Sequence, residues 1–138
     1  MKYLRIYAKF VPNVWHEVKP ILEKVIDRTF HETTIEDHYS MLCKGDQTLW
    51  IGASDDNEIL AAGTTQVVTY PSKKVLRIIL FASKSGQDLD LFKPLLEEVI
   101  KYGISYGCTG IEAWVRKGFA RKLKWDHEYS IISKPIGV

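Results

Sequence analysis

One stretch in the second half of the chain constrains the fold most, because a strand, a loop, a helix and a second strand follow one another there. Residues 74–81 (Lys-Val-Leu-Arg-Ile-Ile-Leu-Phe) form a β-branched run typical of a β-strand. Apolar residues at helical spacing from Leu91 to Gly103 predict a helix, and residues 111–115 predict the next strand. This order favours an α/β fold.

The first half adds two helices and three strands. Residues 3–10 predict a first strand, and apolar residues at helical spacing predict a helix from Val14 to Phe30, which Pro20 should kink or restart. Thr33 or Thr34 should begin a second helix that ends near Gly45. Residues 48–53 and 58–70 predict a hairpin across the polar turn 54–57, and residues 71–73 lead into the strand 74–81.

Composition limits the classes of protein that the chain can belong to. With 138 residues, 46% of them hydrophobic, we expect one domain over residues 1–138. The net charge of +2 indicates no general polyanion partner. Cys43 and Cys108 lie far apart, which argues against a zinc site or disulfide and favours the cytoplasm. No apolar run approaches the roughly 20 residues that span a bilayer, so we expect no membrane insertion.

Two further elements close the pattern. Residues 117–125 predict a short basic helix, and residues 129–133 predict a last strand. The full order, β-α-α-β-β-β-α-β-α-β, resembles the GNAT N-acetyltransferases. That resemblance implies an α/β fold with a mixed twisted sheet, flanked by helices, that opens in a V between the fourth and fifth strands.

The resemblance also implies a cofactor site for acetyl-CoA after the fourth strand. In the family this turn carries Gln/Arg-x-x-Gly-x-Gly/Ala, and here the matching stretch is Lys84-Ser85-Gly86-Gln87-Asp88-Leu89. The strand near Leu80 and Phe81 would then pair with pantetheine. The pyrophosphate would be held by Lys84, Ser85, Gly86 and Gln87.

A structural interpretation of this loop competes with the cofactor site. The stretch has one glycine where the family pattern has two. Asp88 or Asp90 is a natural N-cap, and a carboxylate there would use the N–H donors and the positive helix end that a phosphate needs. The sequence therefore also predicts a GNAT-like protein without its cofactor.

Strand 111–115 carries the candidate catalytic group. Alternation puts Glu112, Trp114 and Arg116 on one face, where Glu112 could deprotonate an amine through water or could form a buried ion pair. In the family a tyrosine protonates the departing thiolate of the cofactor. It has no match at the same place here, because no tyrosine occurs between Tyr106 and Tyr129, so Tyr129 is the remaining candidate for this acid.

The acceptor cleft and other contacts complete the candidates. We expect Trp50, Thr65, Trp114 and Arg116 to line a cleft for a substrate or a partner. Residues 116–125 mix basic and aromatic side chains and allow a contact with nucleic acid, although a solvated amphipathic helix explains them as well. Residues 31–38 hold several metal-capable side chains, which are interpreted as caps and surface charge, so no metal is expected.

Three functions follow from this sequence. The first is an acyl-CoA-dependent N-acyltransferase that acts on a small-molecule amine or a protein. The second is a binding or virion structural protein on the same scaffold that has lost the cofactor, which Asp88, Asp90 and the missing tyrosine favour. The Trp-x-Arg-Lys-Gly-Phe run followed by Arg-x-Leu-Lys resembles small GNAT-like proteins of bacteriophages, a resemblance that implies a phage or prophage origin and no particular activity. The third is a nucleic-acid contact through residues 116–125. The oligomeric state is not predicted.

Overall fold

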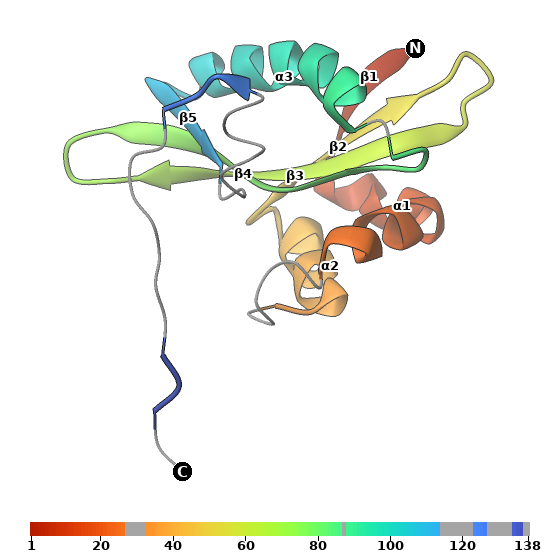
Figure 1. The fold of residues 1–138 in the computed structure, drawn as a ribbon, viewed down its shortest axis with the longest axis horizontal. Coiled ribbons are helices and arrows are strands. Elements are labelled where there is room, and N and C mark those ends of the chain that lie inside the picture. The colour runs from red at the N-terminus through yellow and green to blue at the C-terminus, as the bar shows by residue number, and fades with distance from the viewer. Residues whose placement is uncertain (27–32, 87, 114–122, 127–133, 137–138) are drawn as a thin grey trace.

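The computed structural model describes residues 1–26, 33–86, 88–113, 123–126 and 134–136, with the backbone alone at residues 88 and 89. Along the chain the elements are β1 (Lys2–Ile6), a 3-10 turn η1 (Ala8–Phe10), α1 (Val11–Ile26), α2 (Ile35–Lys44), β2 (Thr48–Ala53), β3 (Ile59–Thr69), β4 (Lys74–Ser83), α3 (Asp88–Ser105) and β5 (Gly110–Ala113). Figure 1 shows them. The predicted order is confirmed through β5, and the last helix and strand of the prediction fall largely or wholly outside the described residues.

The strands form one mixed sheet in the order β1-β2-β3-β4-β5. Neighbours are antiparallel from β1 to β4, whereas β4 and β5 are parallel. α1 and α2 cover one face of the sheet, and α3 covers the other (Figure 1). This α/β architecture is the one that the sequence predicted.

Each face of the sheet has its own hydrophobic core. Under α1 and α2 the buried residues are Val11, Val18, Ile21, Leu22, Ile35, Leu42, Leu49, Ile51, Ile59, Ala62, Leu80 and Ala82. Under α3 they are Trp50, Leu76, Leu95 and Val99. Because strand side chains alternate between the faces, membership of a core shows which way a strand residue points.

The first helix differs from its prediction at the start. The predicted strand 3–10 ends at Ile6, and α1 begins at Val11 rather than Val14. Pro12 therefore lies in the first turn, where a missing N–H leaves no helical hydrogen bond unmade. α1 also continues past Pro20 to Ile26 without the predicted restart.

The second helix has both of its ends fixed by the sequence. The Thr34 side chain accepts from the Asp37 N–H, while the Asp37 carboxylate accepts from the Thr34 N–H at 2.8 Å, which is a capping box. Gly45 ends the helix at φ +83°, a left-handed conformation that favours glycine. The helix start and the end at Gly45 are confirmed.

This cap generates a prediction for the pH dependence of stability. The hydrogen bond from the Thr34 backbone N–H lowers the pKa of Asp37. Because the folded pKa lies below the unfolded one, the ionised carboxylate stabilises the fold above about pH 4, and this stabilisation is lost as the pH falls through the folded pKa. Asp37→Asn should thus lower the free energy of unfolding, measured with urea, at about pH 7 and change it little at about pH 3.

A matched control is Glu36→Gln, which removes a carboxylate from the same turn that forms no part of the capping box. It should leave the free energy of unfolding nearly unchanged at both pH values. An equal loss in both variants, or a loss in Asp37→Asn that does not depend on pH, would contradict the role given to the cap.

Candidate functional site

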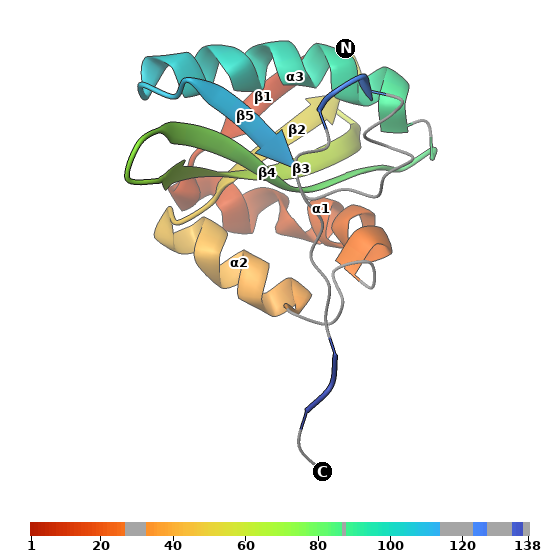
Figure 2. The ribbon, with the colours of Figure 1, turned by 60° about the vertical axis from the view of Figure 1, so that its left-hand side comes forward.

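Over the described residues, which stop at Ala113 on this side, the ladder between β4 and β5 covers only the first part of β4. Its last pair of Cα partners is Ile78 and Ala113, whereas β4 continues to Ser83. Figure 2 shows β5 ending part-way along β4. Among the described residues, no strand pairs with residues 79–83 on that side. An open strand edge presents N–H and C=O groups that can bind an extended, amide-bearing ligand.

A β-bulge in β4 begins at the same point. Thr64 is the partner of Leu80 and Thr65 is the partner of Ile78, so Ile79 is an extra residue in β4. A bulge bends its strand and increases the local twist. The bulge therefore follows directly after the last described β4–β5 pair, at the place where the V is expected between these two strands.

The Leu80 and Phe81 side chains face the protein interior, not the open edge. Leu80 is 3% exposed and belongs to the core under α1 and α2. Phe81 packs on Phe92 of α3, with the ring centroids 5.1 Å apart. Because backbone groups alternate between β3 and the outer edge of β4, only one of these two predicted cofactor residues can present its backbone groups at that edge.

The loop after β4 is held from two sides. Lys24 of α1 donates from Nζ to the carbonyl oxygens of Ser83 and Lys84, at 3.1 and 2.8 Å. The Lys84 N–H donates to the Leu60 carbonyl at 2.7 Å. Gly86 turns the loop at φ +80°. The sequence analysis did not identify Lys24, because no local pattern links this residue to a loop so far along the chain.

The Lys84 side chain already has an anionic partner. Its Nζ lies 2.9 Å from Glu58 Oε1, and both side chains are 57% exposed. The hydrogen bond from Lys84 to Glu58 raises the pKa of Lys84. A phosphate would therefore compete with Glu58 for this ammonium group.

The start of α3 differs from the predicted cap. Asp88 is its first residue and Asp90 its third, so both lie inside the helix and neither stands in the N-cap position before it. Gln87, a predicted cofactor residue, lies outside the described residues. Carboxylates in a first helical turn still interact favourably with the positive helix end.

Glu112 forms an ion pair with a residue that the sequence analysis did not name. Arg77 Nε donates to Glu112 Oε1 at 2.8 Å, and the Tyr70 hydroxyl donates to the same oxygen at 2.9 Å. Arg77 Nη2 donates to the Tyr70 oxygen at 2.9 Å. Burial by itself lowers the pKa of Arg77, but the hydrogen bonds with Glu112 and Tyr70 outweigh it and raise the pKa.

This cluster of Tyr70, Arg77 and Glu112 lies at the base of the V. Arg77 and Glu112 are Cα partners, one pair before the last pair of the ladder. Their neighbours Leu76 and Ile111 pack under α3, so the cluster faces the other side of the sheet. Glu112 keeps 26% of its side chain exposed, and among the described residues no hydrogen bond reaches its Oε2.

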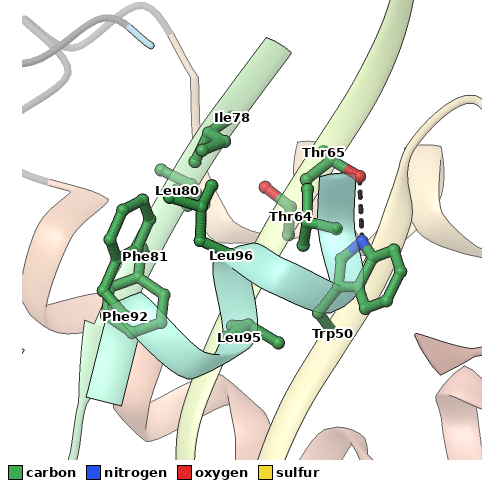
Figure 3. A pocket seen from close by; sticks show the side chains of 10 residues that line it. Trp50, Thr64, Thr65, Ile78, Leu80, Phe81, Phe92, Leu95 and Leu96 are labelled. Atoms are coloured by element: carbon green, nitrogen blue, oxygen red, sulfur yellow. Dashed lines mark hydrogen bonds between the residues drawn. The ribbon is translucent and has the colours of Figure 1, made fainter. Parts of the chain in front are cut away.

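Trp50 and Thr65, expected in an open cleft, are instead core residues. They are 4% and 2% exposed, and the indole N–H donates to Thr65 Oγ1 at 2.9 Å (Figure 3). A buried indole needs an acceptor, which explains why a polar side chain occurs in a central strand. The cavity beside them, under α3, has a volume of about 10 Å³, enough for one water molecule.

Several other candidates fall outside the described residues: Trp114, Arg116, Tyr129 and most of the run 116–125. Within the described part of the chain, no three metal-binding side chains come together. The helices described there are also too short or too polar to cross a membrane.

Comparison with known proteins identifies the fold. No protein-family model matches the chain, and no curated protein matches its sequence. Among solved structures, an aminoglycoside acetyltransferase from an uncultured soil metagenomic sample has a TM-score of 0.71 at 17% identity, covering 99% of this chain and 95% of its own. The ribosomal-protein-alanine N-acetyltransferase of Brucella melitensis biovar Abortus 2308 has a TM-score of 0.72 at 7% identity, covering 99% and 100%.

A further neighbour, a variant of the BH1408 protein of Bacillus halodurans, has a TM-score of 0.72 at 13% identity and covers 99% of both chains. At such low identities the likeness concerns the fold alone. Together with the five-stranded mixed sheet, these similarities show that the chain has the fold of the GNAT acetyltransferases.

Proposed function

We propose that the protein is an acyl-CoA-dependent N-acyltransferase built from one GNAT-like domain. The observation that carries this proposal is the edge of β4 at residues 79–83, which lies behind a bulge and has no partner strand among the described residues. Two free cysteines fit a reducing compartment, so the proposal assigns the reaction to the cytoplasm.

The residues along β4 suit a bound acyl-CoA. Backbone groups of residues 79–83 would pair with the amides of pantetheine, while the Leu80 and Phe81 side chains support the strand from behind. Lys84, Ser85, Gly86 and Gln87 would hold the pyrophosphate, with the loop fixed by Lys24. When bound, acetyl-CoA supplies an activated thioester whose acyl group can pass to an amine.

Glu112 is the proposed base. Arg77 and Tyr70 hold its Oε1, and this anchoring leaves Oε2 directed to bind the ammonium group of an acceptor. Oε2 would take one proton from the nitrogen, directly or through water, so that the neutral amine can attack the thioester carbon. Tyr129 is the proposed acid that protonates the departing thiolate.

The acceptor is proposed to be a small-molecule amine or an amine of a protein. One structural neighbour, an aminoglycoside acetyltransferase, was solved in complex with sisomicin. A carboxylate held at the base of the V is suited to any such cationic group, and it does not by itself select among them.

A second candidate is a binding protein on the same scaffold, encoded by a phage, that no longer uses the cofactor. The specific observation in its favour is that Lys84 is paired with Glu58 while Asp88 and Asp90 occupy the first turn of α3. Both features oppose a pyrophosphate at this loop. Titration with acetyl-CoA separates the two candidates.

We expect acetyl-CoA to bind, and a pair of substitutions should move its affinity in opposite directions. Lys84→Gln removes a cation from the pyrophosphate loop and should weaken binding about threefold to fivefold, the size typical of an exposed ion pair. Glu58→Gln removes the competing carboxylate and should tighten binding by a similar factor. Isothermal calorimetry at low salt measures both effects, which higher salt should reduce.

The matched control is Lys101→Gln, which breaks the exposed Lys101–Glu98 pair of α3 and should leave the affinity unchanged. No heat of binding in the wild type would support the binding protein instead of the transferase. Binding that responds equally to all three variants would show a general charge effect and contradict the assigned loop.

The role of Glu112 generates a separate prediction. Glu112→Gln should lower kcat about 100-fold and leave the KM for acetyl-CoA unchanged, because it removes the base and keeps the shape. Release of the CoA thiol, followed with a thiol-reactive dye over a panel of primary amines, measures both constants. Tyr70→Phe retains the carboxylate and its ion pair with Arg77, so it should retain most of kcat.

A structural role for Glu112 would give a different pattern. Glu112→Gln would then lower the melting temperature because Arg77 loses its counter-ion, while kcat in the folded fraction would stay near the wild-type value.

A further inference from the structure

A second hollow in the structure lies away from the proposed acyl-CoA site. It has a volume of about 190 Å³ and is open to solvent on one side. Its lining comes from the end of β1 and the start of η1, the α2–β2 loop and the last turn of α3: Arg5, Ile6, Tyr7, Ala8, Gly45, Gln47, Thr48, Tyr102 and Tyr106. No part of the proposed reaction uses these residues.

The topology puts this pocket at the opposite end of the sheet from the cofactor loop. From β1 to β4, each strand is antiparallel to the next, so β1 and β4 run in opposite directions. The pocket is at the carboxyl end of β1, and the open edge and loop are at the carboxyl end of β4. Figure 2 shows β1 running beneath α3, whose last turn reaches this end.

Arg5 is held in the pocket between two tyrosine rings. Its guanidinium carbon lies 4.4 Å from the ring centroid of Tyr7 and 5.0 Å from that of Tyr102. Arg5 Nη2 donates to the Tyr7 hydroxyl at 2.6 Å. Cation–π contacts on this scale orient a guanidinium while leaving other N–H groups at its edge available.

The second tyrosine is itself fixed by its neighbours. Tyr102 packs against Tyr106, with centroids 4.6 Å apart, and edge-on against Trp50 at 5.4 Å. Its hydroxyl lies 3.3 Å from Thr48 Oγ1. The aromatic wall is therefore ordered before any ligand binds, which lowers the entropic cost of binding.

Arg5 is a cation whose contacts are all uncharged groups. Within the described part of the chain, no carboxylate lies within ion-pair distance of it. Asp46 stands in the loop between two lining residues, yet it is exposed and makes no ion pair with Arg5. A half-buried guanidinium without a counter-ion is a binding group for an anion.

We propose that this pocket binds a small aromatic carboxylate. The planar guanidinium edge of Arg5 matches the two oxygens of a carboxylate, and the tyrosine wall matches a flat ring beside it. Thr48 adds a hydroxyl to the lining, next to the Tyr102 hydroxyl, whereas the Gln47 amide is buried and bonds to His38 and Met41. The volume suits a single small ring with its acidic group, not a folded partner.

The test is a titration of the full chain with benzoate and with benzamide, which has nearly the same shape without the charge. Ligand-observed and protein-observed NMR report both binding and its location. Benzoate should bind saturably, and benzamide should bind at least tenfold more weakly, as expected for a lost charge-assisted contact. Benzoate should bind without displacing acetyl-CoA, because the two sites lie at opposite ends of the sheet.

Two substitutions at Arg5 sharpen the test. Arg5→Gln should weaken benzoate binding about tenfold or more, and Arg5→Lys should lose part of the affinity, because it keeps the charge without the planar fork. The control Lys9→Gln removes a nearby cation that lies over Phe10 and does not line the pocket, so it should change nothing. If circular dichroism shows that Arg5→Gln is misfolded, the partial loss of benzoate affinity in Arg5→Lys becomes the test.

Four results would overturn the proposal. They are no saturable binding of benzoate, equal binding of benzoate and benzamide, benzoate binding that survives Arg5→Gln in a folded protein, and inorganic phosphate binding as tightly as benzoate. The last would show a site for anions in general and not for planar carboxylates.

Discussion

The parallel pairing of β4 and β5 is the constraint on which the rest of the structure depends. α3 sets this register: Gly107 turns the chain at φ +81°, the Cys108 N–H donates to the Gly103 carbonyl, and the Thr109 N–H donates to the Lys74 carbonyl. A Cβ at Gly103 would meet Leu76 at 3.4 Å, so a glycine allows the helix to approach β4 closely. Over the described residues, β5 is thereby held against the first half of β4.

Two consequences follow from this one arrangement. The second half of β4 bends at Ile79, and no strand among the described residues pairs with its outer edge, where the proposed acyl-CoA would bind. The same register makes Arg77 and Glu112 neighbours at the base of the V, where an ion pair supports the strands and orients a carboxylate. Architecture and candidate chemistry therefore share their residues, so a substitution at this point affects both.

The charges around the V are mostly engaged with partners inside the protein. Lys24 donates hydrogen bonds to the carbonyl oxygens of Ser83 and Lys84. The Lys84 side chain forms an ion pair with Glu58, and Arg77 forms one with Glu112. A pyrophosphate bound here would depend mainly on backbone N–H groups and on the start of α3, as is general for anions at helix starts. This explains how the GNAT scaffold can persist with only a partial glycine motif.

Local patterns in the sequence were enough to predict the strand and helix order through β5, the cap at Thr34 and the end at Gly45, because periodicity and capping are local effects. They could not predict contacts between distant segments. Glu112 pairs with Arg77 because the β4–β5 register makes them neighbours. Trp50 is buried against Thr65 because both pack under α3. The contact of Lys24 with the proposed cofactor loop also joins distant segments, as does the pocket around Arg5, which lies between β1 and the end of α3.

Amide hydrogen exchange along β4 tests the central claim most directly. If an acyl-CoA binds along the open edge, saturating acetyl-CoA should slow exchange of amides in residues 79–83 about tenfold or more, and leave residues 66–77 of the β3–β4 hairpin unchanged. Unchanged exchange over residues 79–83, or protection confined to the hairpin, would contradict the account.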